Sequence, residues 1–585
     1  MEVFSLRFPH LIGNIVCELD NQNLVTFREV NRTFCSFIDD ERFIWIQIIQ
    51  KYIGNTSNCH KKSWKKVMNK APTRNIQELG KAVKKFFKVR KCRLQHEWAP
   101  LHIAAERGCL ALCIFILEKT RERNPRRADG FTALHLAVQN GHYRVSKLIM
   151  DKLVDKNPPC MRDQTPLFIA ALNGRAKICK LLIKDKNSMQ FNLATSLEVA
   201  AKKGHYEVCR LIMSKLSDKI PRDFVLHTPF HNAAENGHLD VCKLFICNLE
   251  NKNPMRPDGF TPLHLAVQKG HIEIFRLIIP LVKDKNLRYF GGRTLLHLAA
   301  NGGFWQICSL LIPHLSDKNP KDDDGWTPLH CAADKGHLEV YNLFIDKVED
   351  INPGCEGIWT PLHWAAENGH YDLCKMLVEQ LKEKNPGDKD GWTPMHCATQ
   401  SGHLKIVELM INYLEDKNPG TNVGWTPLHC TAQNGNAEIC KLILDNTDVK
   451  NPATSEGWTP MHYMAKLGFF ELCQLMISDL SDKNPSNIMG VTPLYYAAQG
   501  GHLKVCKLII ENVQDRQPKD NRGLTPTMWS LRSDLSSMST HNQLLDLFGD
   551  STLKKTLNFC TICEDQFAFI EELTEHYSSV HEFSF

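Results

Sequence analysis

The sequence predicts an all-α dominated protein in which most of the chain forms a solenoid of stacked helix pairs. A short phrase, GWTPLHC at residues 325–331, recurs with small changes from Gly391, Gly424 and Gly457. The threonine of this phrase, or the residue in its place, returns every 33 residues with a single step of 30. Such a period is typical of stacked repeats, because one helix pair cannot bury its own apolar face.

The phrase divides the chain into repeats of nearly constant length. Its threonine position is occupied in order by Ala99, Thr132, Thr165, Thr195, Thr228, Thr261, Thr294, Thr327, Thr360, Thr393, Thr426, Thr459, Thr492 and Thr525. We expect about 13 repeats over residues 97–524 and a degenerate capping repeat over residues 525–550. The step from 165 to 195 lacks three residues, which puts the hairpin of that repeat in doubt.

One repeat, residues 324–353, shows how each element is encoded. Its opening Asp-Gly favours a tight turn, Thr327 is placed as an N-cap, and Pro328 occupies the first helical position, where a missing N–H costs nothing. A short helix over LHCAA then ends at Gly336 in a left-handed cap. The run LEVYNLFIDKV predicts a second, amphipathic helix, and Asn-Pro ends the unit.

These features resemble the ankyrin repeat over about residues 97–548, on the strength of TPLH, the internal Gly-His and the 33-residue step. The resemblance implies antiparallel helix pairs with projecting hairpins, and a concave surface that binds proteins. The sequence departs from the pattern locally, because Leu295 replaces Pro after Thr294 and the last unit reads TPTMWSLRSD.

An aromatic residue stands immediately before the threonine in eight repeats. These residues are Trp98, Phe131, Phe260, Trp326, Trp359, Trp392, Trp425 and Trp458. The ankyrin resemblance places this position on the hairpin near the concave face, which implies a target-binding stripe, and Trp is enriched at interface hot spots. The alternative is that each ring packs on the neighbouring hairpin, or was copied by recent duplication. Both interpretations stay open at this stage.

The histidines and cysteines follow the repeat and do not indicate an enzyme. Ten histidines occupy the TPLH position and eight follow the internal glycine, which predicts structural hydrogen bonds. Pairs such as His330 and Cys331 are adjacent on a helix and therefore do not face each other. Nine of the 22 cysteines lie 14 residues after the threonine position, inside apolar runs, and behave as small buried residues of a reducing compartment.

The N-terminal residues 1–52 predict a small three-helix domain, because apolar residues recur at helical spacing. The segment resembles an F-box, with the apolar anchors of that family at Phe8, Pro9, Leu11, Ile15, Leu19, Leu24, Val30 and Trp45. It departs from the family at Phe8, where the family has Leu, and at Phe34, where it has Trp. The resemblance implies docking onto a Skp-type adaptor that joins a cullin ubiquitin ligase. The alternative is a helical cap for the repeats.

Residues 53–96 form a basic connector that predicts a helix beneath the first repeat. Residues 61–93 hold 13 Lys or Arg and one acidic residue, Glu78, whereas the whole chain has a net charge of +6. Nucleic acid, anionic membrane, a nuclear import receptor or an acidic protein partner are all compatible with this charge, as is a solvated helix face.

The C-terminal residues 558–585 carry the spacing of a metal site, with Cys560, Cys563, His576 and His581 as candidate ligands. Two thiolates and two imidazoles form a closed tetrahedral Zn²⁺ site, which leaves no open position for catalysis. The segment resembles a Cys-Cys-His-His zinc finger, which implies a ββα fold and one structural zinc. It contains no Lys or Arg from Phe559 to Phe585, so DNA binding is disfavoured, because phosphate contacts supply most DNA affinity.

Taken together, the sequence predicts a non-catalytic adaptor, the substrate receptor of a Skp-cullin-F-box ubiquitin ligase, which holds protein targets on its ankyrin surface. The alternatives are an ankyrin scaffold without a ligase role and a nuclear DNA-binding regulator. No apolar run approaches the roughly 20 residues of a membrane helix, and the start lacks a secretory signal, which favours a cytoplasmic or nuclear location. The sequence does not name the target.

Overall fold

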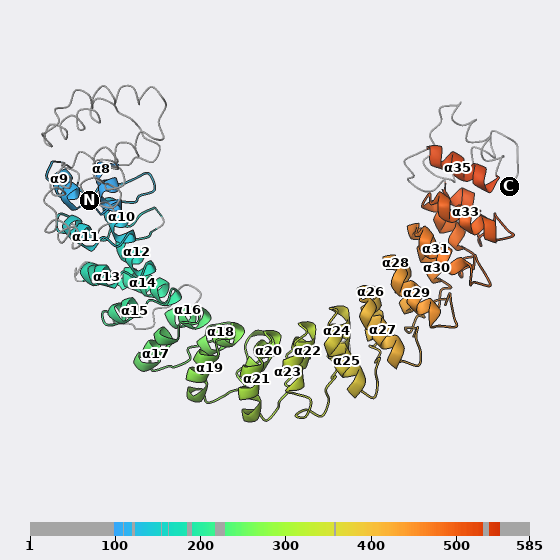
Figure 1. Ribbon diagram of the computed structural model, residues 1–585, viewed down its shortest axis with the longest axis horizontal. Helices are drawn as coiled ribbons and strands as arrows, with labels where there is room; N and C mark the ends of the chain where they lie inside the picture. The colour runs from blue at the N-terminus through green and yellow to red at the C-terminus, as the bar shows by residue number, and fades with distance from the viewer. Residues whose placement is uncertain are drawn as a thin grey trace, which may run out of the picture. The chain divides into compact units, whose positions relative to one another are not determined.

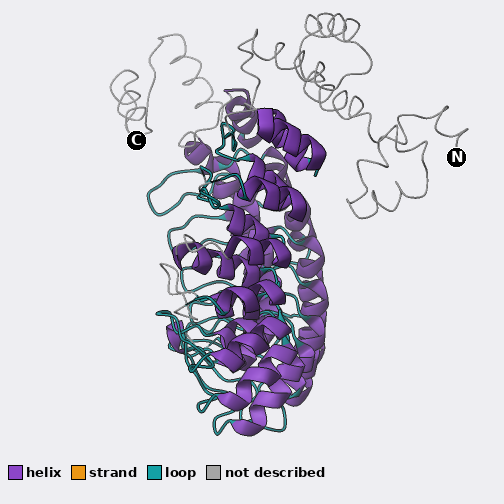
Figure 2. Cartoon of the chain, turned by 90° about the vertical axis from the view of Figure 1, so that its left-hand side faces the viewer, coloured by secondary structure: helices purple, strands orange, loops and turns teal. Residues whose placement is uncertain are grey.

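The computed structural model describes residues 99–108, 110–119, 123–153, 155–161, 163–183, 190–216, 228–355, 359–530 and 538–549. The chain divides between Lys283 and Asp284 into two compact units. Within the described ranges the units consist of helices and loops without a strand (Figure 2), apart from isolated bridges such as Arg288 with Thr294.

In both units the helices form pairs, and each pair stacks on the next one along the chain (Figure 1). The helix that follows the threonine position is called the first helix of its pair, and the helix that follows the internal glycine is the second. First helices pack against first helices, and most second helices against second helices, so each unit has two layers. This arrangement confirms the predicted solenoid for the described residues of each unit.

The first unit contains six described pairs. Its first helices are α8 (Pro100–Glu106), α10 (Ala133–Gln139), α12 (Pro166–Leu172), α14 (Gln190–Lys202), α16 (Pro229–Glu235) and α18 (Pro262–Gln268). Its second helices are α9 (Leu110–Lys119), α11 (Tyr143–Met150), α13 (Ala176–Ile183), α15 (Tyr206–Met213), α17 (Leu239–Asn248) and α19 (Ile272–Ile278), and the short 3-10 helix η1 (Ile279–Leu281) extends α19.

The second unit contains eight described pairs. Its first helices are α20 (Leu295–Asn301), α22 (Pro328–Asp334), α24 (Pro361–Glu367), α26 (Pro394–Gln400), α28 (Pro427–Asn434), α30 (Pro460–Leu467), α32 (Pro493–Gln499) and α34 (Pro526–Ser530). Its second helices are α21 (Trp305–Leu311), α23 (Leu338–Asn342), α25 (Tyr371–Gln380), α27 (Leu404–Tyr413), α29 (Ala437–Asp445), α31 (Phe470–Ile477), α33 (Leu503–Asn512) and α35 (Met538–Phe548). Two 3-10 helices, η2 (Phe290–Gly292) and η3 (Ile312–His314), complete the unit.

The first helices begin as the sequence predicts. Thr327 has extended backbone angles (φ −118°, ψ 166°), Pro328 is the first helical residue, and the His330 side chain completes a capping box with Thr327. Gly336 then adopts φ +71°, a left-handed conformation that residues with a side chain rarely adopt. A Cβ at Gly336 would also lie 2.4 Å from Nδ1 of His370 in the next pair, so the position requires glycine for two independent reasons.

A second recurring phrase, Asp-Lys-Asn-Pro or a variant of it, joins second helices to the next repeat. At residues 416–419, the Asp416 carboxylate accepts the Asn418 N–H (2.9 Å), and the Asn418 side-chain oxygen accepts the N–H of Leu428 in α28 (3.0 Å). The Lys417 ammonium donates to the carbonyl oxygens of Ile411 and Leu414 at the end of α27. The phrase therefore caps the helix before it and the helix after it.

Two of the expected elements differ from the structure. The second helix expected over LEVYNLFIDKV is confined to α23, because Tyr341 replaces the small Cys of other repeats and is fully buried together with Phe344. After Asn342 backbone hydrogen bonds join residues three apart, as in a 3-10 helix. One of them runs from the Phe344 N–H to the Tyr341 carbonyl (3.0 Å).

The repeat with the short spacing also departs from the pattern. Thr195 was expected to cap a helix, yet α14 begins at Gln190 and Thr195 lies inside it. Ser196 stands where most repeats have Pro, but α10 and α20 also lack this Pro and still begin directly after Thr132 and Thr294. The structure gives no reason for the early start of α14. No helix in the described part of the chain is long and apolar enough to cross a membrane.

Candidate functional site

The hairpins position the aromatic residues that precede each threonine. The Trp326 N–H donates to a carboxylate oxygen of Asp322 (2.7 Å), and the Trp326 carbonyl accepts the Asp322 N–H (2.7 Å). Asp388 holds Trp392 in the same way, while Thr421 holds Trp425 through its hydroxyl (3.0 Å). These bonds hold the backbone at Trp326, Trp392 and Trp425, and the Thr454 hydroxyl holds that at Trp458 (3.1 Å). The five rings of Trp326, Trp359, Trp392, Trp425 and Trp458 are called here the Trp ladder.

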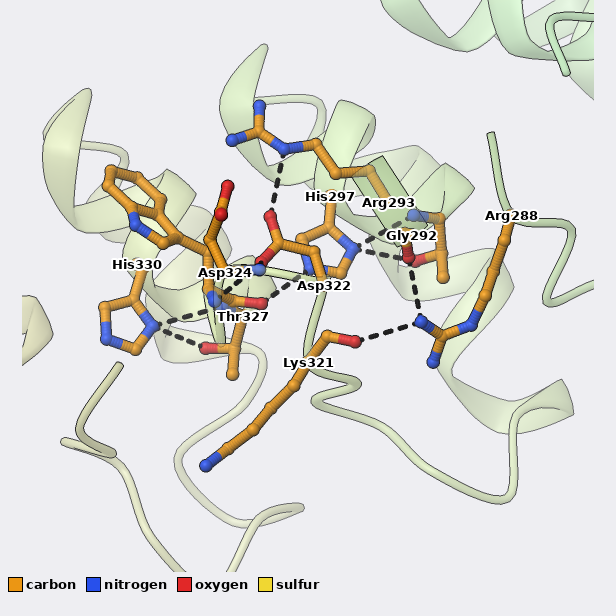
Figure 3. A network of polar contacts seen from close by, with 11 residues as sticks. Arg288, Gly292, Arg293, His297, Lys321, Asp322, Asp324, Thr327 and His330 are labelled. Atoms are coloured by element: carbon orange, nitrogen blue, oxygen red, sulfur yellow. Dashed lines mark hydrogen bonds and ion pairs between the residues drawn. The ribbon is translucent and has the colours of Figure 1, made fainter. Parts of the chain in front are cut away.

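The TPLH histidines connect each repeat to the next one. The backbone N–H of Thr327 donates to Nδ1 of His330 (3.1 Å), so Nδ1 carries no proton and Nε2 carries it. Nε2 donates to the carbonyl oxygen of Trp359 (3.2 Å), 29 residues further on. Burial of the imidazole lowers the His330 pKa to about 4, which keeps the ring neutral at physiological pH. His297 makes the equivalent bond to Trp326 (3.1 Å), and Figure 3 shows both histidines in the network around Asp322.

The histidines that follow the internal glycine form a second row, and they donate hydrogen bonds to the preceding repeat. Nε2 of His370 donates to the carbonyl oxygen of Asp334 (3.0 Å), 36 residues before it, at the end of α22. Equivalent bonds recur in both units, for example from His142 to the Glu106 carbonyl (2.9 Å). Both rows thus have the structural role that the sequence predicted. The neighbouring thiols are equally unsuited to chemistry, because burial raises the pKa of Cys331 to about 12.

The rings of the Trp ladder are partly buried: one part of each ring packs on the protein and another part is exposed. Each ring contacts the TPLH histidine of its own repeat, with centroids between 4.8 Å (Trp392 with His396) and 5.8 Å (Trp326 with His330). Trp326 and Trp359 also contact Trp364, at 4.8 and 5.0 Å. All five keep part of their surface exposed. Each ring therefore packs on the first helix of its own repeat, and Trp326 also packs on that of the next repeat, while the exposed parts leave a stripe that a partner could contact.

A second aromatic row beside the Trp ladder was missed from the sequence. In four repeats the fourth residue after the threonine is aromatic, namely Trp364, Tyr463, Tyr496 and Trp529. Three repeats of the same unit have Cys at this position. Tyr463 contacts Trp425 (5.0 Å) and Trp458 (4.9 Å), and Tyr496 contacts Trp458 (4.7 Å). The substitution of Trp or Tyr for Cys in HCAA-like stretches was the available signal.

Charged residues complete this surface. Arg293 occupies the ladder position of its own repeat, and its Nε donates to a carboxylate oxygen of Asp322 at 3.0 Å (Figure 3). The indole Nε1 of Trp359 makes the equivalent bond to Asp388 (2.9 Å). In both cases the donor and the aspartate are 29 residues apart. The aspartate in the hairpin of one repeat therefore accepts a hydrogen bond from the ladder residue of the repeat before it.

Two repeats of the first unit have phenylalanine at the ladder position. Phe131 contacts His135 (5.1 Å) and Phe260 contacts His264 (5.7 Å). A guanidinium covers each ring, from Arg127 at 5.8 Å and from Arg256 at 5.5 Å. These cation–π contacts were not predicted from the sequence.

Several predicted site residues lie outside the described residues. These are Trp98, the F-box anchors Phe8, Pro9, Leu11, Ile15, Leu19, Leu24, Val30 and Trp45, and the zinc ligands Cys560, Cys563, His576 and His581. The basic connector at residues 53–96 lies outside them too. Their roles stay predictions.

Comparisons with known proteins identify the repeats. A family described as ankyrin repeats (3 copies) matches residues 76–160, 151–223, 221–289, 279–355, 349–421, 412–487 and 464–549. No curated protein matches the chain. Among solved structures, the human ASB11 ankyrin repeat domain is 23% identical with a TM-score of 0.33, over 37% of this chain and 98% of that chain.

Proposed function

The chain belongs to the ankyrin-repeat family, whose members are generally non-catalytic protein-binding scaffolds, and we propose that its Trp ladder is the surface that holds a target protein. The observation that carries this proposal is the run of five partly exposed tryptophans in consecutive repeats. Each is held by a hairpin hydrogen bond or by ring packing, so little side-chain entropy would be lost on binding. Rigid aromatic side chains of this kind are typical of interface hot spots.

The target-binding role is tested with matched tryptophan variants. Proteins captured by the wild-type chain would be compared with those captured by Trp359→Leu and Trp392→Leu, and by Trp305→Leu as the control. Trp305 is 46% exposed and lies at the start of α21, in the layer of second helices. A target that is lost only with the ladder variants supports the proposal. A target that all variants retain would assign binding to another surface.

We further propose that the chain is the substrate receptor of a Skp-cullin-F-box ubiquitin ligase. This step rests on the order of apolar anchors in residues 1–52, from Phe8 to Trp45, and on their resemblance to the F-box. The first segment would hold the ligase while the repeats hold the target, and ubiquitin transfer would be performed by the partner subunits.

The ligase link is tested by capture of a Skp-type adaptor and a cullin. We expect the wild-type chain to capture both, and a Pro9→Ala, Ile15→Ala double variant to lose them while retaining its helical circular dichroism signal. Failure of the folded wild type to capture either protein would leave an ankyrin scaffold without a ligase role, and residues 1–52 would then be interpreted as a cap.

A further inference from the structure

Cations of the chain itself cover the rings at both ends of the Trp ladder. The Arg293 guanidinium lies 5.9 Å from the centroid of Trp326, and the Lys466 ammonium lies 5.6 Å from Trp458 and 5.8 Å from Tyr496. These distances fall within the range of cation–π attraction to an indole or phenol ring. The protein thus uses its own Arg and Lys side chains where the ladder begins and where it ends.

The middle of the ladder has no such cover within the described residues. Trp359, Trp392 and Trp425 are partly exposed, and no Lys or Arg of the described chain lies over them. Their ring contacts are with His363 (5.6 Å), His396 (4.8 Å) and His429 (5.1 Å), and Trp359 and Trp425 also contact Trp364 (5.0 Å) and Tyr463 (5.0 Å). These contacts use part of each ring, so three neighbouring rings remain available to a cation from outside.

Acidic side chains accompany these uncovered rings. Asp388 accepts from the Trp359 indole (2.9 Å) and from the Trp392 N–H (2.7 Å), and it makes no ion pair within the described residues. Its counterpart Asp322 is paired with Arg293. Over residues 352–368, 385–401 and 418–434 the sequence holds four acidic residues and one lysine. An excess of negative charge beside electron-rich rings attracts cations.

We infer that Trp359, Trp392 and Trp425 receive arginine or lysine side chains from an extended basic segment of the partner protein, with Asp388 as a counter-charge. This inference rests on the proposed role of the Trp ladder in target binding and adds the chemistry of the target. Packed helices lie about 10 Å apart, and a polyproline II segment advances about 9 Å in three residues with every third side chain on one face. The geometry thus fits a basic residue at every third position.

The test uses the full chain and a fluorescent synthetic peptide with arginine at every third position among prolines. The matched control peptide has citrulline, which keeps the shape of arginine without its charge. We expect the arginine peptide to bind, the citrulline peptide to bind at least about tenfold more weakly, and added salt to weaken only the former. Equal binding of the two peptides, or no binding to the folded wild type, overturns the inference.

Protein variants locate the site. Trp392→Leu and Asp388→Asn should each weaken binding of the arginine peptide by about fivefold or more, whereas Trp458→Leu, whose ring Lys466 already covers, should change it by less than about twofold. An equal loss for Trp392→Leu and Trp458→Leu contradicts the assignment. Circular dichroism melting shows whether each variant is folded. The comparison of the citrulline and arginine peptides uses the wild-type chain, so a folding defect in a variant does not affect it.

Two further outcomes distinguish a basic partner from the chain's own basic segment and from a target of different chemistry. Peptide binding that appears only after Lys84, Lys85 and Lys88 are changed to Gln would assign the surface to the basic connector of the chain and overturn a partner role. A captured target that depends on the ladder while the arginine peptide fails to bind would overturn the inference alone, and the proposed target-binding role would stand.

Discussion

At the residue scale, the buried histidines make the protein sensitive to acid. The pKa is lowered by burial to about 4 for His135, His297, His330, His363, His396, His429 and His462. The unfolded chain has the ordinary pKa near 6.5, so between about pH 6.5 and 4 the unfolded state binds more protons than the folded state. The free energy of unfolding therefore decreases as the pH is lowered through this window.

We predict that the urea midpoint is constant above about pH 7 and falls steeply between about pH 6.5 and 4. Each of these histidines contributes at most about 3 kcal/mol to the accompanying loss in the free energy of unfolding, since one pKa unit corresponds to about 1.4 kcal/mol. The measurement is urea unfolding followed by circular dichroism at several pH values. A His330→Gln variant should show a shallower dependence than the wild type, and an unchanged midpoint at about pH 5 would rule out the buried neutral rings.

The left-handed glycines supply a second prediction at this scale. Gly468 (φ +76°) has the His502 ring 2.4 Å from where a Cβ would lie, whereas Gly523 (φ +79°) has nothing within 4 Å. Alanine at Gly523 should cost about 1 kcal/mol from backbone strain alone. Alanine at Gly468 should cost at least about 1 kcal/mol more, because the His502 ring must also move. Thermal unfolding of the two variants measures the difference, and equal losses would show that His502 moves freely.

At the element scale, the Asp-Lys-Asn-Pro phrase stabilises both helices that it joins. The Asn418 side chain is buried, and its oxygen accepts the N–H of Leu428 at the start of α28. We predict that Asn418→Ala lowers the free energy of unfolding by about 1–2 kcal/mol, as expected for a lost cap. Asn422 is the matched control, because its exposed side chain donates to the Lys389 carbonyl (2.8 Å), and Asn422→Ala should change stability by less than about 0.5 kcal/mol. Chemical denaturation of both variants checks the ranking.

The sequence predicted most helix starts and failed where a local substitution changed the packing. Thr followed by Pro marked the first residue of α22, α24 and their equivalents, because an N-cap and a proline act within one turn. The early start of α14 has no marker in the sequence, because α10 and α20 lack the same proline and begin directly after their threonines. The short α23 depends on how a buried Tyr341 is accommodated. The second aromatic row and the pairing of Arg293 with Asp322 join residues of different repeats, and spacing within one repeat does not reveal such contacts.

At the scale of the whole molecule, the repeats and the C-terminal segment should respond differently to metal removal. In each unit, helix pairs contact neighbouring pairs, so the stability of the repeats comes from many similar interfaces. The predicted zinc finger at residues 558–585 is too small for a core and should fold only with metal.

We predict one bound zinc per chain, lost in Cys560→Ala and in His576→Ala variants and measured by elemental analysis. A chelator should leave the thermal midpoint of the helical signal unchanged, because the described repeats contain no group of metal-ligating residues. Zinc retention in both variants would exclude this ligand set. A chelator that melts the helical signal would place a metal within the repeats.

The two rows of histidine bonds have a consequence for how this protein could change its length. His330 reaches 29 residues forward and His370 reaches 36 residues back, and the same two offsets recur in neighbouring repeats. Gain or loss of one complete 33-residue unit within this run therefore leaves each histidine with a backbone carbonyl at the same offset. Deletion or duplication of such a unit would shorten or lengthen the array while the fold survives, and within residues 326–458 each event would remove or add one tryptophan of the ladder.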